Sequence, residues 1–555
     1  MKSDAIKKGI ERAPHRALLK SLGIVENDLK KPFIAIVNSY TSIVPGHVHL
    51  NHVANAVANG IRRGGGVPFE FNTIAVCDGL AMGHEGMKYS LPSRDIIADS
   101  IEIMIQAHRF DGMVLIPNCD KVTPGMLMAA ARIDIPSIVI TGGPMLSGRY
   151  KGRKLGVISM FEAVGEFKAN KITKKDLKEF EDRACPTPGS CNGMFTANTM
   201  ACVTEALGLS LPYSAAIPAV DVRRQRIAEK SGEKILDLIN KDLKPSDVLN
   251  IDSFQNAIIV DMALGGSTNT VLHLSAIARE ARIPLSLEIF DTISKKTPHL
   301  CDMSPSGPYT MDDLDKAGGI PAVMKELEPF LNSESITVST FTISKNIEEA
   351  KTFDKEVIRP LSNPVHQEGG ISILWGNIAP KGAVVKTGAV PPELLTHKGP
   401  ARVFNSEEDA MNAILNGNIK KRDVVLIRFE GPKGGPGMRE MLSPSSAIVG
   451  LGLSESIALI TDGRFSGGSR GLCVGHISPE AAENGPIAII EEEDIIEIDI
   501  PHRTINVQIC EKELLSRLQK LEPFKFKIQK GYLTRYSNMV KSANEGATLR
   551  IPYTK

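Results

Sequence analysis

Short apolar runs alternate with helix-like segments through the first part of the chain, and this order limits the fold more than any other feature. A repeated β–α–β–α order is typical of a parallel sheet whose faces are covered by helices. The predicted elements are, in chain order, Phe33–Val37, His47–Ile61, Phe71–Val76, Arg94–His108 with Ser93 as its cap, Met113–Ile116 and Ile135–Ile140. Polar motifs follow the predicted strands, so we expect them to meet at one edge of the sheet.

The pattern of apolar residues along the sequence changes near Leu361–Gly370. Beyond this stretch, short β-type runs are separated by Gly and Pro, which is typical of a barrel or a sandwich. These runs are Ile371–Trp375, Ala383–Lys386, Val424–Phe429, Ile457–Ile460, Ile487–Glu491 and Ile495–Ile500. A chain of 555 residues is also too long for a single core. We therefore predict an α/β protein, with an N-terminal parallel-sheet α/β domain over residues 1–365 and a C-terminal β-rich, barrel-like domain over residues 366–555.

The charge and cysteine content argue against several classes of function. The chain has 65 basic and 64 acidic residues and is only 5% aromatic, so we expect no binding to nucleic acid or to an anionic membrane. No apolar run is long enough to span a membrane, and the first residues lack the apolar core of a secretory signal. The eight cysteines are scattered and form no disulfide framework, which favours a reducing cytoplasm.

One predicted strand is followed by Cys119, Asp120 and Lys121 on consecutive positions. A thiolate is a good ligand for an iron–sulfur cluster or zinc, whereas a carboxylate suits magnesium, so the triplet indicates two different metals side by side. The plainer interpretation is a buried structural cysteine beside a surface Asp/Lys pair. We disfavour it because a second cysteine motif and several acidic motifs lie on similar loops.

The second cysteine motif runs from Cys185 to Cys191, in a Pro/Gly loop before a helix-like segment that begins near Thr196. Thiols at a helix N-terminus have a lowered pKa and are good metal ligands. The spacing is not C-x-x-C, which argues against a zinc finger or a thioredoxin motif. Together with Cys119 this motif forms a candidate cluster site. The cysteines at 202, 301, 473 and 510 are expected to be buried as small apolar side chains.

Asp78, Asp120 and Glu440 are the candidate ligands for a hard metal ion. Glu440 lies in the glycine-rich segment Glu430–Met441, for which the alternative interpretation is a flexible loop in solvent. Ser466 lies in another Gly/Ser loop after a predicted strand. From the residues alone it is a nucleophile, a phosphate contact or a turn residue, and the turn is favoured because no G-x-S-x-G elbow is present.

Four segments together resemble the dihydroxy-acid dehydratase family, which is related to the phosphogluconate and sugar-acid dehydratases. The segments are Cys77–Arg94, Cys119–Gly125, Cys185–Thr196 and Leu459–Gly467. The resemblance extends through nearly the whole chain, and two of its motifs are long and specific. It therefore carries expectations about cofactors and catalysis that the spacing of residues could not supply.

The resemblance implies two inorganic cofactors and a catalytic base. It implies an iron–sulfur cluster on Cys119 and Cys191, and it makes Ser466 the base. The Mg²⁺ ligands that it implies are Asp78, Asp120, Glu440 and a carbamylated Lys121.

The third ligand of the cluster is left open by one departure from the family pattern. Certain relatives with a [2Fe–2S] cluster have a cysteine in the segment where this chain has Gly46. Cys77 and Cys185 are the alternatives for the missing ligand. The family favours [2Fe–2S], and [4Fe–4S] stays open.

The implied activity is dehydration of (2R)-2,3-dihydroxy-3-methylbutanoate and 2,3-dihydroxy-3-methylpentanoate to 2-oxo acids, in valine, leucine and isoleucine biosynthesis. A homodimer or homotetramer is expected. A sugar-acid dehydratase, acting on a gluconate or pentonate with the same site, is the alternative enzyme. An iron–sulfur electron carrier is disfavoured because carriers usually have a compact four-cysteine motif. A Mg²⁺-dependent phosphate-binding protein ranks last because no P-loop or dinucleotide fingerprint occurs in the proper strand–helix context.

Overall fold

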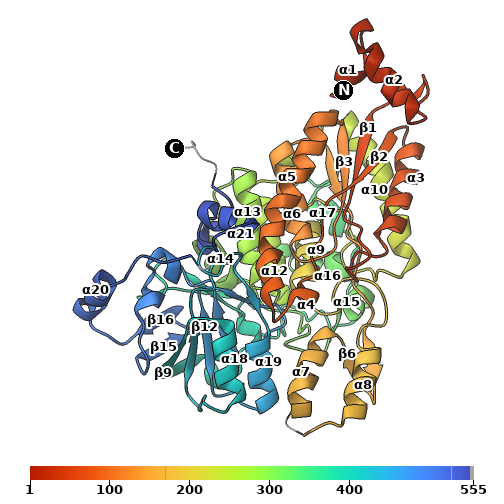
Figure 1. Ribbon diagram of the computed structural model, residues 1–555. Coiled ribbons are helices and arrows are strands. Elements are labelled where there is room, and N and C mark those ends of the chain that lie inside the picture. The colour runs from red at the N-terminus through yellow and green to blue at the C-terminus, as the bar shows by residue number, and fades with distance from the viewer. Residues whose placement is uncertain (169, 527, 551–555) are drawn as a thin grey trace.

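The computed structural model describes residues 1–168, 170–526 and 528–550 (Figure 1). Its first part is built on a four-stranded sheet with the order β2-β1-β3-β4, in which every pairing is parallel. The strands are β1 (Phe33–Asn38), β2 (Val67–Asn72), β3 (Gly112–Ile116) and β4 (Ser137–Val139). The predicted parallel α/β architecture is confirmed.

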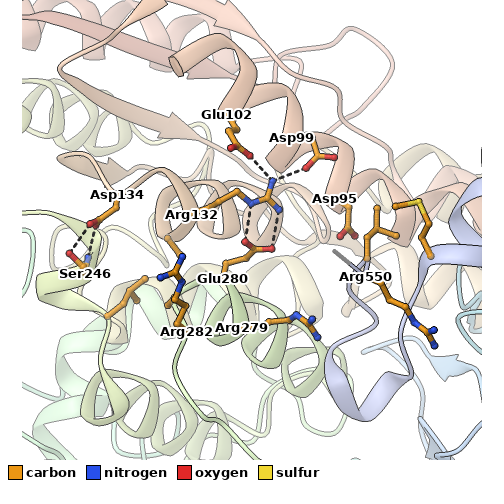
Figure 2. Close-up of a pocket in the computed structure, with 15 residues that line it drawn as sticks. Asp95, Asp99, Glu102, Arg132, Asp134, Ser246, Arg279, Glu280, Arg282 and Arg550 are labelled. Atoms are coloured by element: carbon orange, nitrogen blue, oxygen red, sulfur yellow. Dashed lines mark hydrogen bonds and ion pairs between the residues drawn. The ribbon is translucent and has the colours of Figure 1, made fainter. Parts of the chain in front are cut away.

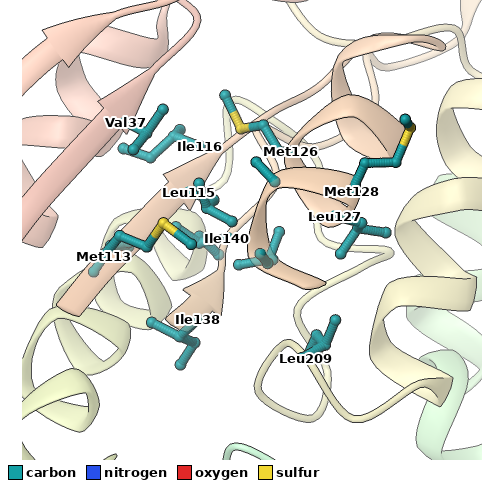
Figure 3. Close-up of a cluster of buried hydrophobic side chains, with 14 of the residues drawn as sticks. Val37, Met113, Leu115, Ile116, Met126, Leu127, Met128, Ile138, Ile140 and Leu209 are labelled. Carbon is teal, nitrogen blue, oxygen red and sulfur yellow. The ribbon is translucent and has the colours of Figure 1, made fainter. Parts of the chain in front are cut away.

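Helices cover both faces of this sheet (Figure 1). Helices α3 (Leu50–Arg63) and α10 (Val222–Asn240) pack against each other on one face, while α5 (Ser90–His108) and α6 (Val122–Ile133) lie together on the other. Figure 3 shows apolar side chains of β3 and α6 meeting in the buried layer between them. Because β3 and α6 are joined by only five residues, the loop that carries Cys119 to Lys121 is held at both ends by this core.

Several predicted elements of this part have wrong boundaries, and strand β2 and helix α5 differ most. Strand β2 begins at Val67 because its register with β1 starts there, and the ladder ends where the Thr73 N–H donates to the Asn38 carbonyl. The apolar residues that follow do not extend the strand, and Ile74 is half exposed. Helix α5 begins at Ser90, so Ser93 lies inside its first turn and is not its cap.

Further helices pack behind α6 and hold the long loops of the first part. Helix α9 (Thr196–Ala206) follows the second cysteine motif and contacts α12 (Ile251–Leu264), while α13 (Asn269–Glu280) packs against α6. The other α-helices of five residues or more in the first part are α2 (Ala13–Ser21), α7 (Val157–Lys168), α8 (Lys174–Arg183), α14 (Leu287–Lys296), α15 (Met311–Ala317), α16 (Gly319–Glu326) and α17 (Ile343–Ile347).

The second part contains an eight-stranded mixed sheet with the order β16-β15-β9-β10-β12-β14-β8-β7. A bridge between Trp375, which follows β7, and Thr504 of β16 nearly closes the sheet. The β-rich, barrel-like prediction is therefore confirmed. The strands are β7 (Ser372–Leu374), β8 (Ala383–Val385), β9 (Thr396–Phe404), β10 (Val424–Ile427), β12 (Ala458–Thr461), β14 (Leu472–Gly475), β15 (Ile495–Asp499) and β16 (Thr504–Val507).

The apolar runs located some of these strands and misplaced one. The predicted strand Ile487–Glu491 is wrong, because residues Pro486–Ile489 form a 3₁₀ helix with proline at its start. Strands β9, β14 and β16 were not predicted. The first of them contains a Gly-Pro pair, and the other two are only four residues long. Helices α18 (Glu407–Leu415) and α19 (Ser443–Leu451) pack against each other, and α18 contacts β9 and β10. The short strands β11 (Glu440–Met441) and β13 (Arg464–Phe465) pair in parallel.

The end of the described chain returns to the first part. Helix α21 (Tyr532–Met539) and the residues after it pack with Leu91 and Leu272. The Arg94 guanidinium donates to the carbonyls of Gly546 and Ala547, at 2.9 Å each. The domain boundary between residues 365 and 366 stays a prediction. Within the described ranges, no helix is both long and apolar enough to cross a membrane.

Candidate metal centre

The Lys121 ammonium lies among three carboxylates that the sequence analysis had selected as metal ligands. Its Nζ is 2.5 Å from an oxygen of Asp78, 2.7 Å from Glu440 and 3.8 Å from Asp120. One oxygen from each of these acids can be chosen so that all three lie within 4.8 Å of one another. Asp78, Lys121 and Glu440 are buried, and Asp120 is partly buried. The structure therefore brings together all four predicted magnesium ligands.

Loops after the parallel strands position the ligands of the first part. Asp78 begins the short helix α4 (Asp78–Ala81), and its second oxygen accepts a hydrogen bond of 2.7 Å from the Ser90 hydroxyl. Asp120 and Lys121 occupy the turn between β3 and α6. The expected gathering of polar motifs at the carboxyl edge of this sheet is thereby confirmed.

Glu440 is brought to the centre by the second part of the chain. It lies in β11, directly across from Arg464 in β13. The Arg464 guanidinium donates to Glu440 at 2.5 Å and to the Asn269 side chain at 3.0 Å. Glu440 is only 1% exposed, so the alternative of a flexible solvent loop is wrong.

The charges at the centre fit a bound cation. Three carboxylates face the two cationic side chains Lys121 and Arg464, which leaves one negative charge in excess. Burial raises the pKa of Asp120, and the charge of Asp78 raises it further. Oxygen donors of this kind are those that Mg²⁺ prefers. A divalent cation would therefore relieve the repulsion that the two cationic side chains leave uncompensated.

Cys119 is held beside this centre by a buried histidine. The Cys119 N–H donates to His47 Nε2 at 3.0 Å, so the other ring nitrogen, Nδ1, carries the proton and donates to the Ser39 carbonyl at 2.7 Å. Burial lowers the pKa of His47 to about 4, which keeps the ring neutral. Two hydrogen bonds thus fix the backbone from which the Cys119 thiol projects.

Three cysteines lie within electrostatic reach of one another. Burial raises the pKa of Cys119 and of Cys191 well above the ordinary thiol value, and the charge of Cys191 raises the pKa of Cys119 further. Cys77 acts on both of these thiols, whereas Cys185 acts on Cys191. Buried thiols at such high pKa values become thiolates only with a compensating positive charge, which bound iron would supply.

Gly46 leaves space against the Cys119 sulfur. A Cβ at position 46 would lie 2.9 Å from Cys119 Sγ, closer than side chains pack. The same loop contacts both cysteine motifs, since the Gly189 N–H donates to the Pro45 carbonyl and the Asn118 side chain donates to the Gly46 carbonyl. The residues around Cys119 therefore fit an iron–sulfur cluster.

Ser466 directly follows β13 and lies next to the strand that carries Glu440. Its N–H donates to the Met441 carbonyl at 2.9 Å, and its hydroxyl accepts from the Gly468 N–H at 3.2 Å. A Cβ at Gly467 would lie 2.9 Å from the Ser267 hydroxyl, so the loop packs directly against the first part. Ser466 thus makes turn contacts, as the residues alone suggested, at a position beside the metal centre.

Two residues of the site were missed by the sequence analysis. Arg464 lies inside the Leu459–Gly467 motif, and it is completely buried against Glu440. His47 was placed at the start of a predicted helix, although α3 begins only at Leu50. A buried arginine within an otherwise apolar and small-residue motif was the available signal for the first. No pattern in the residues indicated the second.

A large cavity lies elsewhere in the molecule. It has a volume of about 770 Å³ and lies between α5, α6, α13 and the C-terminal segment (Figure 2). Arg132 crosses it and pairs with three acids, which are Asp99, Glu102 and Glu280. None of the predicted ligands lines this cavity, so size alone does not locate the metal centre.

Comparison with known proteins covers almost the entire chain. The family model for the N-terminal part of dihydroxy-acid/6-phosphogluconate dehydratases matches residues 31–346, and the C-terminal model matches residues 356–547. A dihydroxy-acid dehydratase from Acetivibrio thermocellus is 58% identical over 551 residues, which cover 99% of this chain and 100% of the relative. Proteins of the same name from Caldicellulosiruptor saccharolyticus and Methanococcus aeolicus are each 57% identical with the same coverage.

Proposed function

Since the chain belongs to the dihydroxy-acid/6-phosphogluconate dehydratase family, we propose that it removes water from branched 2,3-dihydroxy acids and yields the 2-oxo acids from which valine, leucine and isoleucine are made. The observation that carries the proposal is the buried cluster in which Lys121 joins Asp78 to Glu440. The similar proteins are dihydroxy-acid dehydratases, which favours branched dihydroxy acids over sugar acids as substrates.

The magnesium site is proposed to consist of Asp78, Asp120, Glu440 and a carbamylated Lys121. Carbamylation joins the neutral Lys121 amine to carbon dioxide and releases one proton, which converts a cation into an anionic oxygen ligand. The three neighbouring carboxylates support this assignment, because they hold the amine in the position that a ligand oxygen would need. A metal ion in their midst would favour the anionic form of the side chain over the ammonium.

The cluster ligands are proposed to be Cys119, Cys191 and Cys77. The first two lie on the loops that resemble the family motifs. Cys77 is favoured over Cys185 because its charge acts on both of the other thiols and because it directly precedes the magnesium ligand Asp78. This placement would set the iron and the magnesium side by side.

Dehydration requires the loss of the C2 proton and of the C3 hydroxyl, with no net oxidation or reduction. When bound, the metals would supply Lewis acidity that polarises the substrate oxygens and favours a deprotonated serine. Ser466 Oγ would take the C2 proton as the C2–C3 double bond forms and the C3–O bond breaks. The departing hydroxide would take up a proton and leave as water, and the enol that remains would tautomerise to the 2-oxo acid. Arg464 holds Glu440 in place, so that the carboxylate stays directed at the centre during the reaction.

The proposal is tested by anaerobic purification followed by iron, sulfide and magnesium analysis and by an assay of 2-oxo-acid formation. Branched dihydroxy acids and sugar acids are compared as substrates at equal concentration. We expect both metals to be present and the branched substrates to have the higher kcat/KM. A higher kcat/KM on gluconate or a pentonate would identify a sugar-acid dehydratase, and a cluster that is reduced by dithionite without any turnover would identify an electron carrier.

The assembly and location of the enzyme are also proposals. We expect a homodimer or homotetramer in the cytoplasm, where the scattered cysteines stay reduced and available to iron. Light scattering of the purified protein measures the assembly directly.

A further inference from the structure

We propose that Lys386 is a positioning residue for the reaction: its amine holds the Gly467 carbonyl and thereby fixes the loop of Ser466. The proposal rests on the role of Ser466 proposed above. It assigns a function to a buried charged side chain that takes no part in either metal site.

Lys386 reaches the Ser466 loop from the end of β8. The side chain is almost completely buried, and its Nζ donates to the Gly467 carbonyl at 3.3 Å. Among the described residues this is the one hydrogen bond of its ammonium. Burying a charge is costly unless it is hydrogen-bonded and paired. Despite this cost, the Lys386 ammonium is buried where it donates to the Gly467 carbonyl, one residue beyond Ser466.

Asp261 of helix α12 is the buried acid that acts on Lys386. It is completely buried, and neither of its carboxylate oxygens has a hydrogen-bond partner within the described part of the chain. Burial raises the pKa of Asp261 well above its ordinary value, which favours the neutral carboxyl, and the charge of Lys386 lowers that pKa only in part. Asp261 raises the pKa of Lys386, which burial lowers to about 8. The hydrogen bond to the Gly467 carbonyl is therefore the contact that holds the Lys386 ammonium.

The Ser466 loop needs an external restraint. Gly467 and Gly468 have no side chains that would limit their backbone, and glycine is the most mobile residue in this respect. Before the glycines, the Ser466 N–H is tied to the Met441 carbonyl. After Ser466, the Ser469 N–H donates to the Ser466 carbonyl at 3.0 Å within the loop, and Lys386 is the side chain that ties the Gly467 carbonyl from outside it. Ser466 is thus held on both sides, which sets the direction of its hydroxyl.

A purely structural role of these two buried side chains is the competing explanation, and the Asp261→Asn/Lys386→Met double variant separates the two explanations. Each single variant changes the surroundings of the other buried side chain, so both are expected to lose stability. The double variant removes both titratable groups and should regain stability relative to each single variant. It still lacks the donor to Gly467, so a positioning role predicts that its kcat stays low.

The experiment measures kcat, KM, metal content and thermal unfolding of the metal-loaded enzyme. Lys386→Met is expected to lower kcat about 10²-fold, the scale of a small misplacement of a reacting group, with KM, iron and magnesium unchanged. Lys386→Arg, which keeps a donor, should recover part of kcat. Lys381→Met is the matched control, because Lys381 is an exposed lysine just before the same strand.

Wild-type kcat in Lys386→Met, or a double variant that regains kcat together with stability, would overturn the positioning role. Ser466→Ala measured in parallel separates this inference from the one it rests on. If Ser466→Ala is inactive while Lys386→Met is normal, only the role of Lys386 fails. If Ser466→Ala is fully active, the proposed serine base fails, and the role of Lys386 fails with it.

Discussion

The Lys121 ammonium lies 2.7 Å from a carboxylate oxygen of Glu440, although 319 positions separate the two residues in the chain. Lys121 is placed by the parallel sheet, and Glu440 by a short strand beside the barrel-like sheet. The centre is therefore complete only when both parts of the chain are folded and in contact. A ligand that binds this centre stabilises the contact by mass action.

Glu440→Gln is expected to weaken magnesium binding, because the substitution removes one of three negative charges at the centre while keeping its size. The heat of Mg²⁺ binding and the Mg²⁺-induced rise in Tm both measure the effect, and each should shrink. Glu455→Gln, at an exposed glutamate of the second part, is the control. Unchanged Mg²⁺ affinity in Glu440→Gln would remove Glu440 from the ligand set.

Lys121→Arg keeps a positive charge but cannot form the carbamate, so it is expected to be inactive and to bind magnesium weakly. Mass spectrometry of the native wild-type protein under bicarbonate should show the added carbon dioxide on Lys121. Lys433→Arg, at a lysine paired with Glu483, is the control. Wild-type turnover by Lys121→Arg would show that carbamylation is not required.

Cys119→Ser and Cys191→Ser are each expected to lose most of the bound iron, because a serine hydroxyl is a poor ligand for a cluster iron. Iron and sulfide content and the visible absorption of the cluster are the measurements. Cys510→Ser should retain both, because Cys510 is exposed and its expected burial is wrong, whereas Cys202, Cys301 and Cys473 are buried as expected. A full iron complement in either of the first two variants would contradict the assignment of that cysteine.

Glu480 is expected to make stability fall as the pH rises. It is buried where it accepts hydrogen bonds from the Lys433 and Gly434 N–H groups, and burial raises its pKa to about 8. Between its ordinary pKa near 4.5 and this value, the folded protein binds more protons than the unfolded chain. Stability therefore decreases through that window, by at most about 1.4 kcal/mol per pH unit.

Chemical denaturation of the wild type and of Glu480→Gln at a series of pH values checks this effect. The variant should show a flatter decline between pH 4.5 and 8. Glu455→Gln, at an exposed glutamate, should follow the wild type. Parallel curves for the wild type and Glu480→Gln would show that the Glu480 carboxyl is not protonated in the folded state.

The parts of the site that follow strands in sequence could be predicted from the sequence. Cys119 to Lys121 come directly after β3, and the topology of a parallel sheet brings this loop to the same edge as Asp78. The β–α–β–α order sufficed for that step. The roles of Lys121 and Ser466 came only from the family resemblance, since the spacing of residues indicates neither a carbamylated lysine nor a serine base.

The contact between Glu440 of the second part and the ligands of the first part could not be predicted in the same way. Glu440 reaches the centre through a ladder of two residue pairs with β13, which is too short to give a periodic pattern. Arg464 then donates to its carboxylate, and Asn269, 195 positions from Arg464 in the chain, accepts from the same guanidinium. Strand β9 was missed for a different reason, because its Gly-Pro pair is typical of a loop. Pro400 lies at the end of the ladder with β15, and the ladder with β10 begins only at Ala401, so the strand needs no N–H donor at this position on the β10 side.

The central claim, that Ser466 removes the C2 proton beside the metal centre, is tested most directly by following exchange of that proton with deuterated solvent by NMR. Exchange isolates the proton transfer from loss of water and product release. Ser466→Ala should keep its iron and magnesium and lose exchange by roughly 10²–10⁴-fold, the usual cost of removing a general base. Exchange at the wild-type rate in the metal-loaded alanine variant would contradict the account.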